Sequence, residues 1–501
     1  MSTFGKTKSL ASIGIIGSGI SGMAAAIELA ASGHQVRIFE KNSGFGGRGR
    51  SMKAEGYSFD MGPSWYWMPD VFEQFFNKHG RSTSDYFTLD RLDPSYRIFF
   101  KDGLIDAPAE MKEIEAVFEE KEAGSAAFLR KFLKEAQYKY EVGMSDFVTK
   151  PSLSLLEFMD LRILSSLFRL EMLKSIESVI HQGIKNEQLR SWLSFPVLFL
   201  GAKPSDTPAL YSLMNYADME LGTWYPKGGM TRLFEAFYKL ALEKGVKFSF
   251  EDAVESIGIS GKKFTHLVSA SGTHKFDFLI SSADYHHTDT VLLPVEARQY
   301  SDAYWESRKM APGSLIFYLG VRRKLPGLLH HNLFFDADFQ EHAADIYDLH
   351  RWPEDPLFYV CMSSATDDSV APAGHENLFI LMPIAAGLKE DEALKNQYLD
   401  LIIGRMETRL GYSFREDIDY CRSFCTEDFI SEYHSFKGNA YGLANTLDQT
   451  AILKPRVRHK KISNLFFAGQ LSHPGPGLPP SMISGQITAR LIQKETSKSS
   501  K

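Results

Sequence analysis

The sequence is poor in cysteine and has no long uninterrupted apolar stretch. Only 3 cysteines occur among 501 residues, too few for a disulfide framework and typical of a reducing compartment. Cys421 and Cys425 stand 4 positions apart, but no Cys or His pair at zinc-ligand spacing accompanies them, so we expect buried thiols. No run reaches the roughly 18 apolar residues that a membrane-spanning helix needs, so no transmembrane helix is predicted.

An excess of positive charge is also missing. The chain carries 56 basic and 62 acidic side chains, and its formal net charge is −6. This balance lacks the basic footprint of a nucleic-acid-binding protein, so no nucleic-acid partner is expected. The N-terminus has no secretory pattern, because glycines break its apolar segment near residue 13.

Aromatic residues, in contrast, are abundant. They make up 13% of the chain and include 37 phenylalanines. A large apolar cavity or a membrane-facing surface would use so many aromatic side chains. A chain of 501 residues is too long for one simple core, so we expect two domains.

The chain begins with an apolar strand, a glycine-rich turn, an alanine-rich helix and a second strand. Residues 13–16 form the first apolar run, residues 17–22 read G-x-G-x-x-G, and residues 36–39 form a second run that ends in Glu40. Strand, turn, helix, strand and acid follow in the order of a dinucleotide-binding unit. The sequence therefore predicts a Rossmann-like nucleotide site here.

Each residue of this unit has a physical task. Gly17 permits the tight turn, Gly19 lets the backbone approach a pyrophosphate, and Gly22 lets the helix lie close to the strand. The helix N-terminus then faces the phosphates with its free amides and its dipole. Glu40 is placed to accept hydrogen bonds from a ribose 2′-hydroxyl, and its charge disfavours a 2′-phosphate.

The segment after Glu40 decides which dinucleotide is predicted. Gly46 and Gly47 are followed by Arg48, which suits a second close pass of the backbone with a cation beside the phosphates. This continuation resembles that of the amine-oxidase-like flavoproteins, and a nicotinamide dehydrogenase does not ordinarily need it. FAD is therefore the predicted cofactor.

Gly62 and Pro63 mark a turn, and three aromatic residues, Trp65 to Trp67, follow Ser64. Two interpretations stay open for this aromatic row. The side chains either belong to the core or line a slot beside the flavin ring. Solvent exposure of all three is not expected.

Residues 153–174 predict a helix with a very broad apolar face that is interrupted by Arg162, Arg169 and Lys174. A core helix explains the leucine content, and from this segment alone it is the better interpretation. The alternative is an interfacial helix, with aliphatic side chains in the acyl layer and cations near anionic headgroups.

Two adjacent histidines, His330 and His331, raise the question of a metal. Residues next to each other on a strand point to opposite faces, so no metal site is predicted. Near the C-terminus, a buried strand leads through Gly469 and Gly477 to Pro479 and Pro480, which suit the start of a helix. That helix N-terminus would stabilise negative charge on the reduced flavin ring.

These motifs together resemble those of the bacterial and fungal type of phytoene desaturase, the carotenoid desaturases of the amine-oxidase-like FAD superfamily. The resemblance spans about residues 12–492. It departs from the pattern at Gln470 and Pro480. Beyond the opening unit and the Gly46-Gly47-Arg48 segment, it is carried by Phe59-Asp60-x-Gly62-Pro63-Ser64, Tyr225-Pro-x-Gly-Gly229, Asp355-Pro-Leu-Phe-Tyr-Val and His473-Pro-Gly-x-Gly-x-Pro.

The resemblance implies an α/β fold: a Rossmann-like FAD-binding domain of the amine-oxidase type with an interleaved α+β substrate domain and membrane-associated helices. We expect the FAD-binding domain to be discontinuous, over residues 1–85, 225–300 and 455–501. The substrate-binding, membrane-associated domain is then expected over residues 86–224 and 301–454. Such an enzyme is expected in the cytoplasm, held peripherally on the inner face of the cell membrane.

The implied activity is the FAD-dependent desaturation of phytoene to lycopene by successive dehydrogenations, with a quinone or oxygen as electron acceptor. A C40 hydrocarbon has no polar handle, so its binding must come from buried apolar area, at ~25 cal/mol/Å². No nucleophile–base pair or triad is found, so no catalytic residue is predicted. The cofactor-binding residues predicted are Gly17, Gly19, Ile20, Ser21, Gly22, Glu40, Lys41, Gly46, Gly47, Arg48, Gly62, Pro63, Ser64, Val254, Gly469, Gln470, Gly477, Pro479, Pro480 and Ser481.

Other functions use the same scaffold. A 3,4-desaturase of hydroxylated carotenoids, a carotene isomerase and a carotenoid oxidase differ in tunnel lining, which one sequence does not reveal. An amine oxidase would need an aromatic cage and no apolar entrance. A non-catalytic isoprenoid carrier would have no use for the intact Gly46-Gly47-Arg48 segment.

Overall fold

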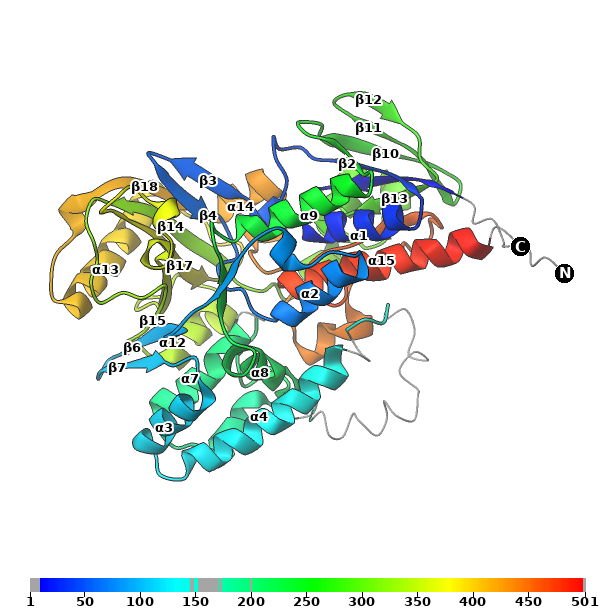
Figure 1. The fold of residues 1–501 in the computed structure, drawn as a ribbon. Helices are drawn as coiled ribbons and strands as arrows, with labels where there is room; N and C mark the ends of the chain where they lie inside the picture. The colour runs from blue at the N-terminus through cyan, green and yellow to red at the C-terminus, as the bar shows by residue number, and fades with distance from the viewer. Residues whose placement is uncertain (1–9, 145–147, 152–170, 172–173, 199–200, 499–501) are drawn as a thin grey trace.

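A computed structural model describes residues 10–144, 148–151, 171, 174–198 and 201–498 (Figure 1). The helix predicted over residues 153–174 lies outside the described residues except for Glu171 and Lys174. No helix of the described segments is long and apolar enough to cross a membrane.

A parallel sheet of 5 strands forms the nucleotide half, in the order β19-β13-β1-β2-β9. β1 lies at its centre and pairs with β2 and β13, and its Ile13 and Ile15 are fully buried. Strands buried on both faces are typical of parallel sheets flanked by helices. The strands are β1 (Ser12–Ile16), β2 (Gln35–Phe39), β9 (Lys247–Ser249), β13 (Phe278–Ser281) and β19 (Leu465–Phe467).

Three helices from distant parts of the chain pack together beside this sheet (Figure 1). They are α1 (Ile20–Ala31), α9 (Thr231–Glu243) and α15 (Leu478–Lys498). The closest approach is between α1 and α15, where a Cβ at Gly485 would lie 2.2 Å from the Ser21 carbonyl oxygen. Glycine there is what lets the two ends of the chain meet.

A second, smaller sheet follows the parallel strand β9 in the chain. β10 (Val254–Ser260) pairs antiparallel with β11 (Lys263–Ser269), which pairs with β12 (Gly272–His274). Within β10 only Ile257 is buried, which suits a sheet with one solvated face.

A mixed sheet of 7 strands dominates the other half, in the order β18-β14-β17-β16-β15-β6-β7. β6 and β7 form the hairpin predicted around residues 99–103. The strands are β6 (Tyr96–Phe100), β7 (Leu104–Ala107), β14 (Gly313–Val321), β15 (His331–Phe335), β16 (Phe358–Cys361), β17 (Glu376–Ile384) and β18 (Ile418–Phe424).

Helices surround this sheet (Figure 1). A helical layer is formed by α3 (Met111–Lys121), α4 (Ser125–Val142), α6 (Ile176–Gly183), α7 (Glu187–Leu198) and α8 (Leu213–Met219). The remaining helices are α2 (Pro69–Lys78), α10 (Tyr285–His287), α11 (Asp302–Glu306), α12 (Phe339–Ala344), α13 (Glu392–Leu410) and α14 (Thr426–Tyr433). Two further sheets have two antiparallel strands each. β3 (Ser51–Ala54) and β4 (Tyr57–Asp60) form a hairpin, whereas β5 (Leu89–Arg91) pairs with the distant β8 (Trp224–Pro226).

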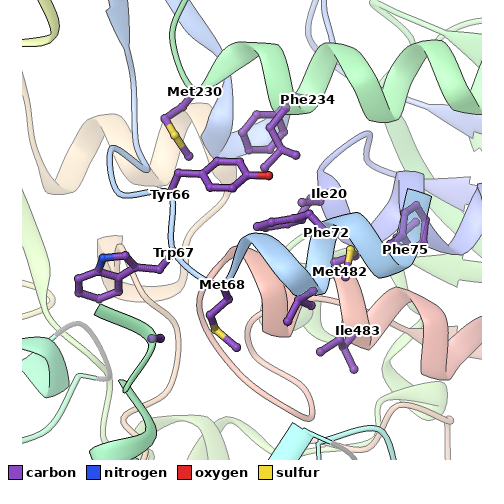
Figure 2. Packing of buried hydrophobic residues seen from close by; sticks show 14 of the residues in the cluster. Ile20, Tyr66, Trp67, Met68, Phe72, Phe75, Met230, Phe234, Met482 and Ile483 are labelled. Carbon is purple, nitrogen blue, oxygen red and sulfur yellow. The ribbon is translucent and has the colours of Figure 1, made fainter. Parts of the chain in front are cut away.

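A buried cluster of aromatic and aliphatic side chains holds the two halves together. Figure 2 shows Phe72 of α2 beside Ile20 of α1, with Met482 of α15 nearby and Phe234 of α9 above them. Phe72 is fully buried and Phe234 nearly so. Each such side chain stabilises the fold by ~1.5–3 kcal/mol, so this cluster fixes the helices that surround the glycine turn.

The thiols only partly match their prediction. Cys361 and Cys425 are buried, whereas Cys421 is exposed, and all three are free. Cys421 lies on β18, an edge strand of the mixed sheet, and edge strands leave part of their side chains in solvent.

Candidate active site

A cavity of about 440 Å³ lies where four strands of the parallel sheet end. Its wall contains the residues that directly follow β1, β2, β13 and β19, among them Gly17, Glu40, Ser282 and Gly469. Ligands of open α/β sheets bind at this carboxyl edge, where the loops leave a crevice. The sheet thus positions the site, and segments that are far apart in the sequence meet around the cavity.

The glycine turn after β1 has the geometry of a phosphate cradle. Gly17 has a φ of +93°, which only glycine adopts without strain. A Cβ at Gly22 would lie 2.3 Å from the Gly17 carbonyl oxygen, so glycine is required for the helix to close on the turn. A Cβ at Gly19 would meet no protein atom within 4 Å, because it would point into the cavity.

Glu40 lines the cavity at the end of β2 and is held by its neighbours. One carboxylate oxygen accepts from the Ser18 amide at 2.9 Å and the Ser18 hydroxyl at 2.7 Å. The other accepts from the amide and the side-chain nitrogen of Asn42, both at 3.0 Å. These bonds fix the carboxylate of a buried residue at the edge of the turn, and ribose recognition by Glu40 stays a prediction.

The Gly46-Gly47-Arg48 segment closes over the same turn. The Gly46 amide donates to the Ser18 carbonyl at 3.0 Å, and Gly46 and Gly47 both have positive φ values. The Arg48 guanidinium contacts the Ser435 hydroxyl and the Asn439 carbonyl, yet its buried Nε has no partner among the residues that the structure describes. A buried guanidinium with an unused donor suits an acceptor oxygen of a bound group.

Arg48 and Asp284 are the charged groups deepest in the wall. Burial raises the pKa of Asp284 to about 6, and the nearby Arg48 charge opposes that shift. The Asp284 side chain also accepts from the His287 amide at 3.1 Å and so caps α10. The guanidinium and the carboxylate thus offset each other's charge inside the cavity.

The cavity continues beyond the glycine turns into an apolar slot. Burial of Trp67 is nearly complete, and its indole nitrogen donates to Thr223 at 2.8 Å, which fixes the ring against the wall. Tyr66 is buried in the core, whereas Trp65 and Trp67 line the cavity. Both interpretations of the aromatic row therefore apply, each to different residues. The other apolar lining residues of the slot are Met68, Phe72, Met214, Phe234, Ile316, Leu381 and Phe429.

One wall of the slot carries hydroxyl groups. The Tyr359 hydroxyl donates to the Ser64 hydroxyl at 3.0 Å, and it lies 2.6 Å from Nδ1 of His331. Ser314 and Tyr441 also line the cavity, with the Ser314 hydroxyl beside that of Tyr441. Burial raises the pKa of Tyr441 to about 12, so its hydroxyl stays neutral.

Contrary to the prediction from the sequence, the side chains of the paired histidines do not point to opposite faces of a strand. His331 is the first residue of β15 and His330 precedes the strand, so strand alternation does not separate them. Their ring centroids lie 4.5 Å apart. A ring nitrogen of each and the Cys361 sulfur lie within 4.8 Å of one another, and this group of three buried side chains could hold a metal ion.

Comparison with known proteins identifies this architecture. The sequence model of the flavin-containing amine oxidoreductases matches residues 20–493. A carotenoid 3,4-desaturase from Haloarcula japonica is 38% identical over 481 residues, which cover 95% of this chain and 97% of that protein. A zeta-carotene-forming phytoene desaturase from Myxococcus xanthus is 31% identical, over 95% and 93% of the two chains. This chain belongs to the carotenoid desaturases of the amine-oxidase-like FAD superfamily.

Solved structures share the fold of this flavoprotein. The cyclohexylamine oxidase from Brevibacterium oxydans superposes with a TM-score of 0.57 at 16% identity, over 97% of this chain and 99% of that chain. FAD is the cofactor, and the residues present fit it. The glycine turns leave room for a pyrophosphate, the N-termini of α1 and α15 border the cavity, and Arg48 offers its unused donor.

The structure brings the predicted cofactor residues of this flavoprotein together. All of them except Gly22 line the cavity, and Gly22 instead packs the helix against the turn. Their individual contacts with FAD stay predictions. No sequence motif identifies Asp284 or residues 432–434, which also line the wall. The segment that ends in Asp284 has a signal in its small residues after a buried strand, but α14 has none.

Proposed function

We propose that this flavoprotein is a desaturase of acyclic C40 carotenoids that acts on the 3,4 bond of a chain with a hydroxylated end. The 38% identity to a carotenoid 3,4-desaturase supports this choice. The observation that carries it is the buried Ser314 hydroxyl, which lies beside that of Tyr441 in the mainly apolar slot and has no hydrogen-bond partner of good geometry within the described residues. An unpaired buried hydroxyl costs free energy, so a substrate that supplies a hydrogen-bond partner is favoured over a pure hydrocarbon.

The chain's own residues bind and orient the polyene. Trp65, Trp67 and Met214 bury its apolar surface and exclude water, at ~25 cal/mol/Å² of area removed from solvent. The Ser314 and Tyr441 hydroxyls hold its polar end and so fix which carbon pair lies over the cofactor. FAD, when bound, would supply the two-electron oxidant for the C–H bond. The protein keeps a proton acceptor, the Ser64 hydroxyl, at the same wall.

Desaturation of phytoene to lycopene is the second candidate. The apolar lining of the slot favours it, because aromatic and aliphatic side chains bind a hydrocarbon without polar partners. The phytoene desaturase relative from Myxococcus xanthus supports it at lower identity, 31%. The two candidates differ only in whether the wall hydroxyls contribute to recognition.

Parallel assays separate these candidates. Purified holoprotein is incubated with liposomes that contain either phytoene or a hydroxylated acyclic carotenoid, and products are identified by chromatography and absorbance. Conversion of the hydroxylated substrate alone supports the 3,4-desaturase, and conversion of phytoene alone contradicts it. In Tyr441→Phe, kcat/KM for the hydroxylated substrate is expected to fall roughly 2- to 12-fold, the effect of one neutral hydrogen bond. The Tyr398→Phe variant is the control, since its hydroxyl bonds the Pro353 carbonyl far from the slot.

We further propose that the protein meets its substrate on the inner face of the cell membrane, without spanning it. A C40 polyene has negligible solubility in water, so docking on the bilayer gives the slot access to it. The proposal takes up the alternative interpretation of residues 153–174, an interfacial helix, as the contact segment. Flotation with anionic liposomes tests the proposal: hydrophobic docking resists ~1 M salt, at which the screening length falls to ~3 Å, and release by salt alone contradicts it.

A further inference from the structure

We propose that Ser64, Tyr359, His331, His330 and Thr366 form a proton relay that carries the proton released in each desaturation from the slot to solvent. This proton relay rests on the proposed function, because it requires a dehydrogenation in the slot. Each of its members can both accept and donate a proton, through a hydroxyl or an imidazole. Together they connect the cavity wall to the surface across strands β15 and β16.

The inner part of the relay begins in the cavity. Ser64 and Tyr359 both line it, and their hydroxyl oxygens lie 3.0 Å apart. The Tyr359 hydroxyl lies 2.6 Å from Nδ1 of His331. Register explains this contact, because His331 pairs with Cys361 and Leu333 with Tyr359 across the two strands. Side chains two residues apart share one face of a sheet, so His331, Cys361 and Tyr359 project together.

The middle step passes between the two histidines. Nε2 of His331 is buried and has no hydrogen-bond partner in the described part of the chain. A ring nitrogen of His330, one of His331 and the Cys361 sulfur lie within 4.8 Å of one another. Beside them is a cavity of about 10 Å³, lined by Ser64, His330 and Cys361 among others, which is the size of about one water molecule. The thiol or a water there completes the transfer to His330.

The outer step reaches the surface. Nδ1 of His330 lies 2.9 Å from the Thr366 hydroxyl. His330 is buried, whereas Thr366 is exposed at the end of a short helical turn, residues 363–365. A proton that reaches the Thr366 hydroxyl therefore passes directly to bulk water.

Electrostatics keeps the relay ready to accept a proton. Burial lowers the pKa of His330 to about 3 and holds the pKa of His331 well below its ordinary value. Both rings are therefore neutral at physiological pH, with one nitrogen free to accept. Asp367, which lies near His330, opposes the shift and stabilises the transient cation on that ring. An allylic cation is a strong acid, so weakly basic groups are sufficient to take up its proton.

The balance of the reaction requires such an exit. In each desaturation two C–H bonds break and one C=C bond forms: one hydrogen leaves with its electron pair to the flavin, and the other leaves as a proton. The apolar side chains that line most of the slot cannot take up that proton. In the relay, the hydroxyl hydrogens of Ser64 and Tyr359 turn toward His331, the reverse of the orientation in which the Tyr359 hydroxyl donates to Ser64. Ser64 then takes up the released proton and passes its own proton to Tyr359, Tyr359 to His331, His331 to His330, and His330 to Thr366.

Rapid mixing of oxidised protein with carotenoid, without oxygen, tests the relay through the rate at which the flavin absorbance is bleached. Two variants interrupt it: His331→Gln keeps a polar side chain that cannot take up a proton, and Tyr359→Phe keeps the ring. Each is expected to slow bleaching roughly 10²-fold, the usual contribution of proton transfer by a positioned group. The solvent deuterium isotope effect on bleaching should rise in both, while carotenoid binding, followed by tryptophan quenching, and flavin content stay unchanged.

Matched controls are His342→Gln and Tyr398→Phe, which remove buried, hydrogen-bonded groups away from the slot and are expected to bleach at the wild-type rate. An active wild type with an equally active His331→Gln variant contradicts the relay alone. Slow bleaching that follows from weaker carotenoid binding also contradicts the relay. A stoichiometric metal ion in the purified protein contradicts it too, because the metal would occupy the imidazole lone pairs. A wild type that desaturates no carotenoid contradicts the proposed function.

Discussion

Two glycines of one turn perform different tasks, and the structure separates them. Gly22 is required by the fold, because its Cβ would strike the Gly17 carbonyl at 2.3 Å. Gly19 faces the cavity, where a Cβ meets no protein atom within 4 Å. The sequence motif assigns both to the nucleotide site without distinguishing them. Only the space around each glycine shows that Gly19 lies open to a ligand and that Gly22 is needed for the packing of the helix.

The first prediction uses this difference. Gly19→Ala is expected to leave the melting temperature of the flavin-free protein unchanged, because φ at Gly19 is −68° and the site is open. It should weaken FAD binding roughly 5- to 150-fold, the effect of ~1–3 kcal/mol of overpacking. Gly22→Ala should lower both stability and flavin content. Flavin titration and thermal melting measure the two effects, and a Gly19→Ala variant that binds FAD normally contradicts the assignment.

Buried carboxyl groups predict how stability depends on pH. Asp218 accepts hydrogen bonds from Tyr96 at 2.6 Å and from Thr223 at 3.3 Å, and burial raises its pKa to about 7. The folded state therefore retains a proton that the unfolded chain has lost above ~3.9. This stabilisation is complete below the unfolded pKa and is lost as pH rises through about 7.

The second prediction is that Asp218→Asn removes this pH dependence. In the wild type, the urea midpoint of unfolding should fall between pH 5 and pH 7, from a contribution on the order of 4 kcal/mol. In the variant, the amide carries no titrating proton, so the urea midpoint should change less between pH 5 and pH 7. If the urea midpoint depended equally on pH in the two proteins, Asp218 would already be ionised in the folded state.

At the scale of elements, contact between α1 and α15 joins the two ends of the chain. The glycine turn lies at the N-terminus of α1, and the C-terminal cofactor loop lies at the N-terminus of α15. Gly485 on α15 allows the close approach to Ser21 on α1. A small displacement of α1 against α15 should therefore alter the geometry of the cofactor site.

The third prediction concerns this crossing. Gly485→Ala should lower the free energy of unfolding by ~1–3 kcal/mol, because its Cβ would lie 2.2 Å from the Ser21 carbonyl oxygen. Bound flavin should decrease with it, since both helix N-termini shift. Lys494→Ala on the exposed face of α15 is the control and should change neither. A Gly485→Ala variant with wild-type stability would mean that the helices separate without cost.

Sequence reasoning predicted the local elements well where periodicity and turn residues agree. It located β1, β2, β19 and the start of α15, because short apolar runs, glycines and prolines mark them. It could not assign β10 to its antiparallel sheet, since a strand signal does not specify its partner. It also misread His330 and His331, because a one-residue error in where β15 begins changes which way a side chain points.

At the scale of the whole molecule, the site is assembled from distant segments. The cavity wall combines the opening unit with residues of α14 and with Tyr359 of β16, more than 300 positions away from the glycine turn by the printed numbering. No local motif marks these contributions, because long-range packing alone brings them to the cavity. The Tyr359–His331 contact that carries the relay was unpredictable for the same reason, since it depends on strand register.

The most direct measurement of the central claim is a single-turnover reaction of the purified holoprotein with a hydroxylated acyclic carotenoid in the absence of oxygen. If the glycine turns hold FAD and the slot delivers the polyene to it, the flavin absorbance should bleach. One product molecule with one added conjugated double bond should appear per flavin reduced. A protein that binds the flavin and the carotenoid yet shows neither bleaching nor product would contradict the account.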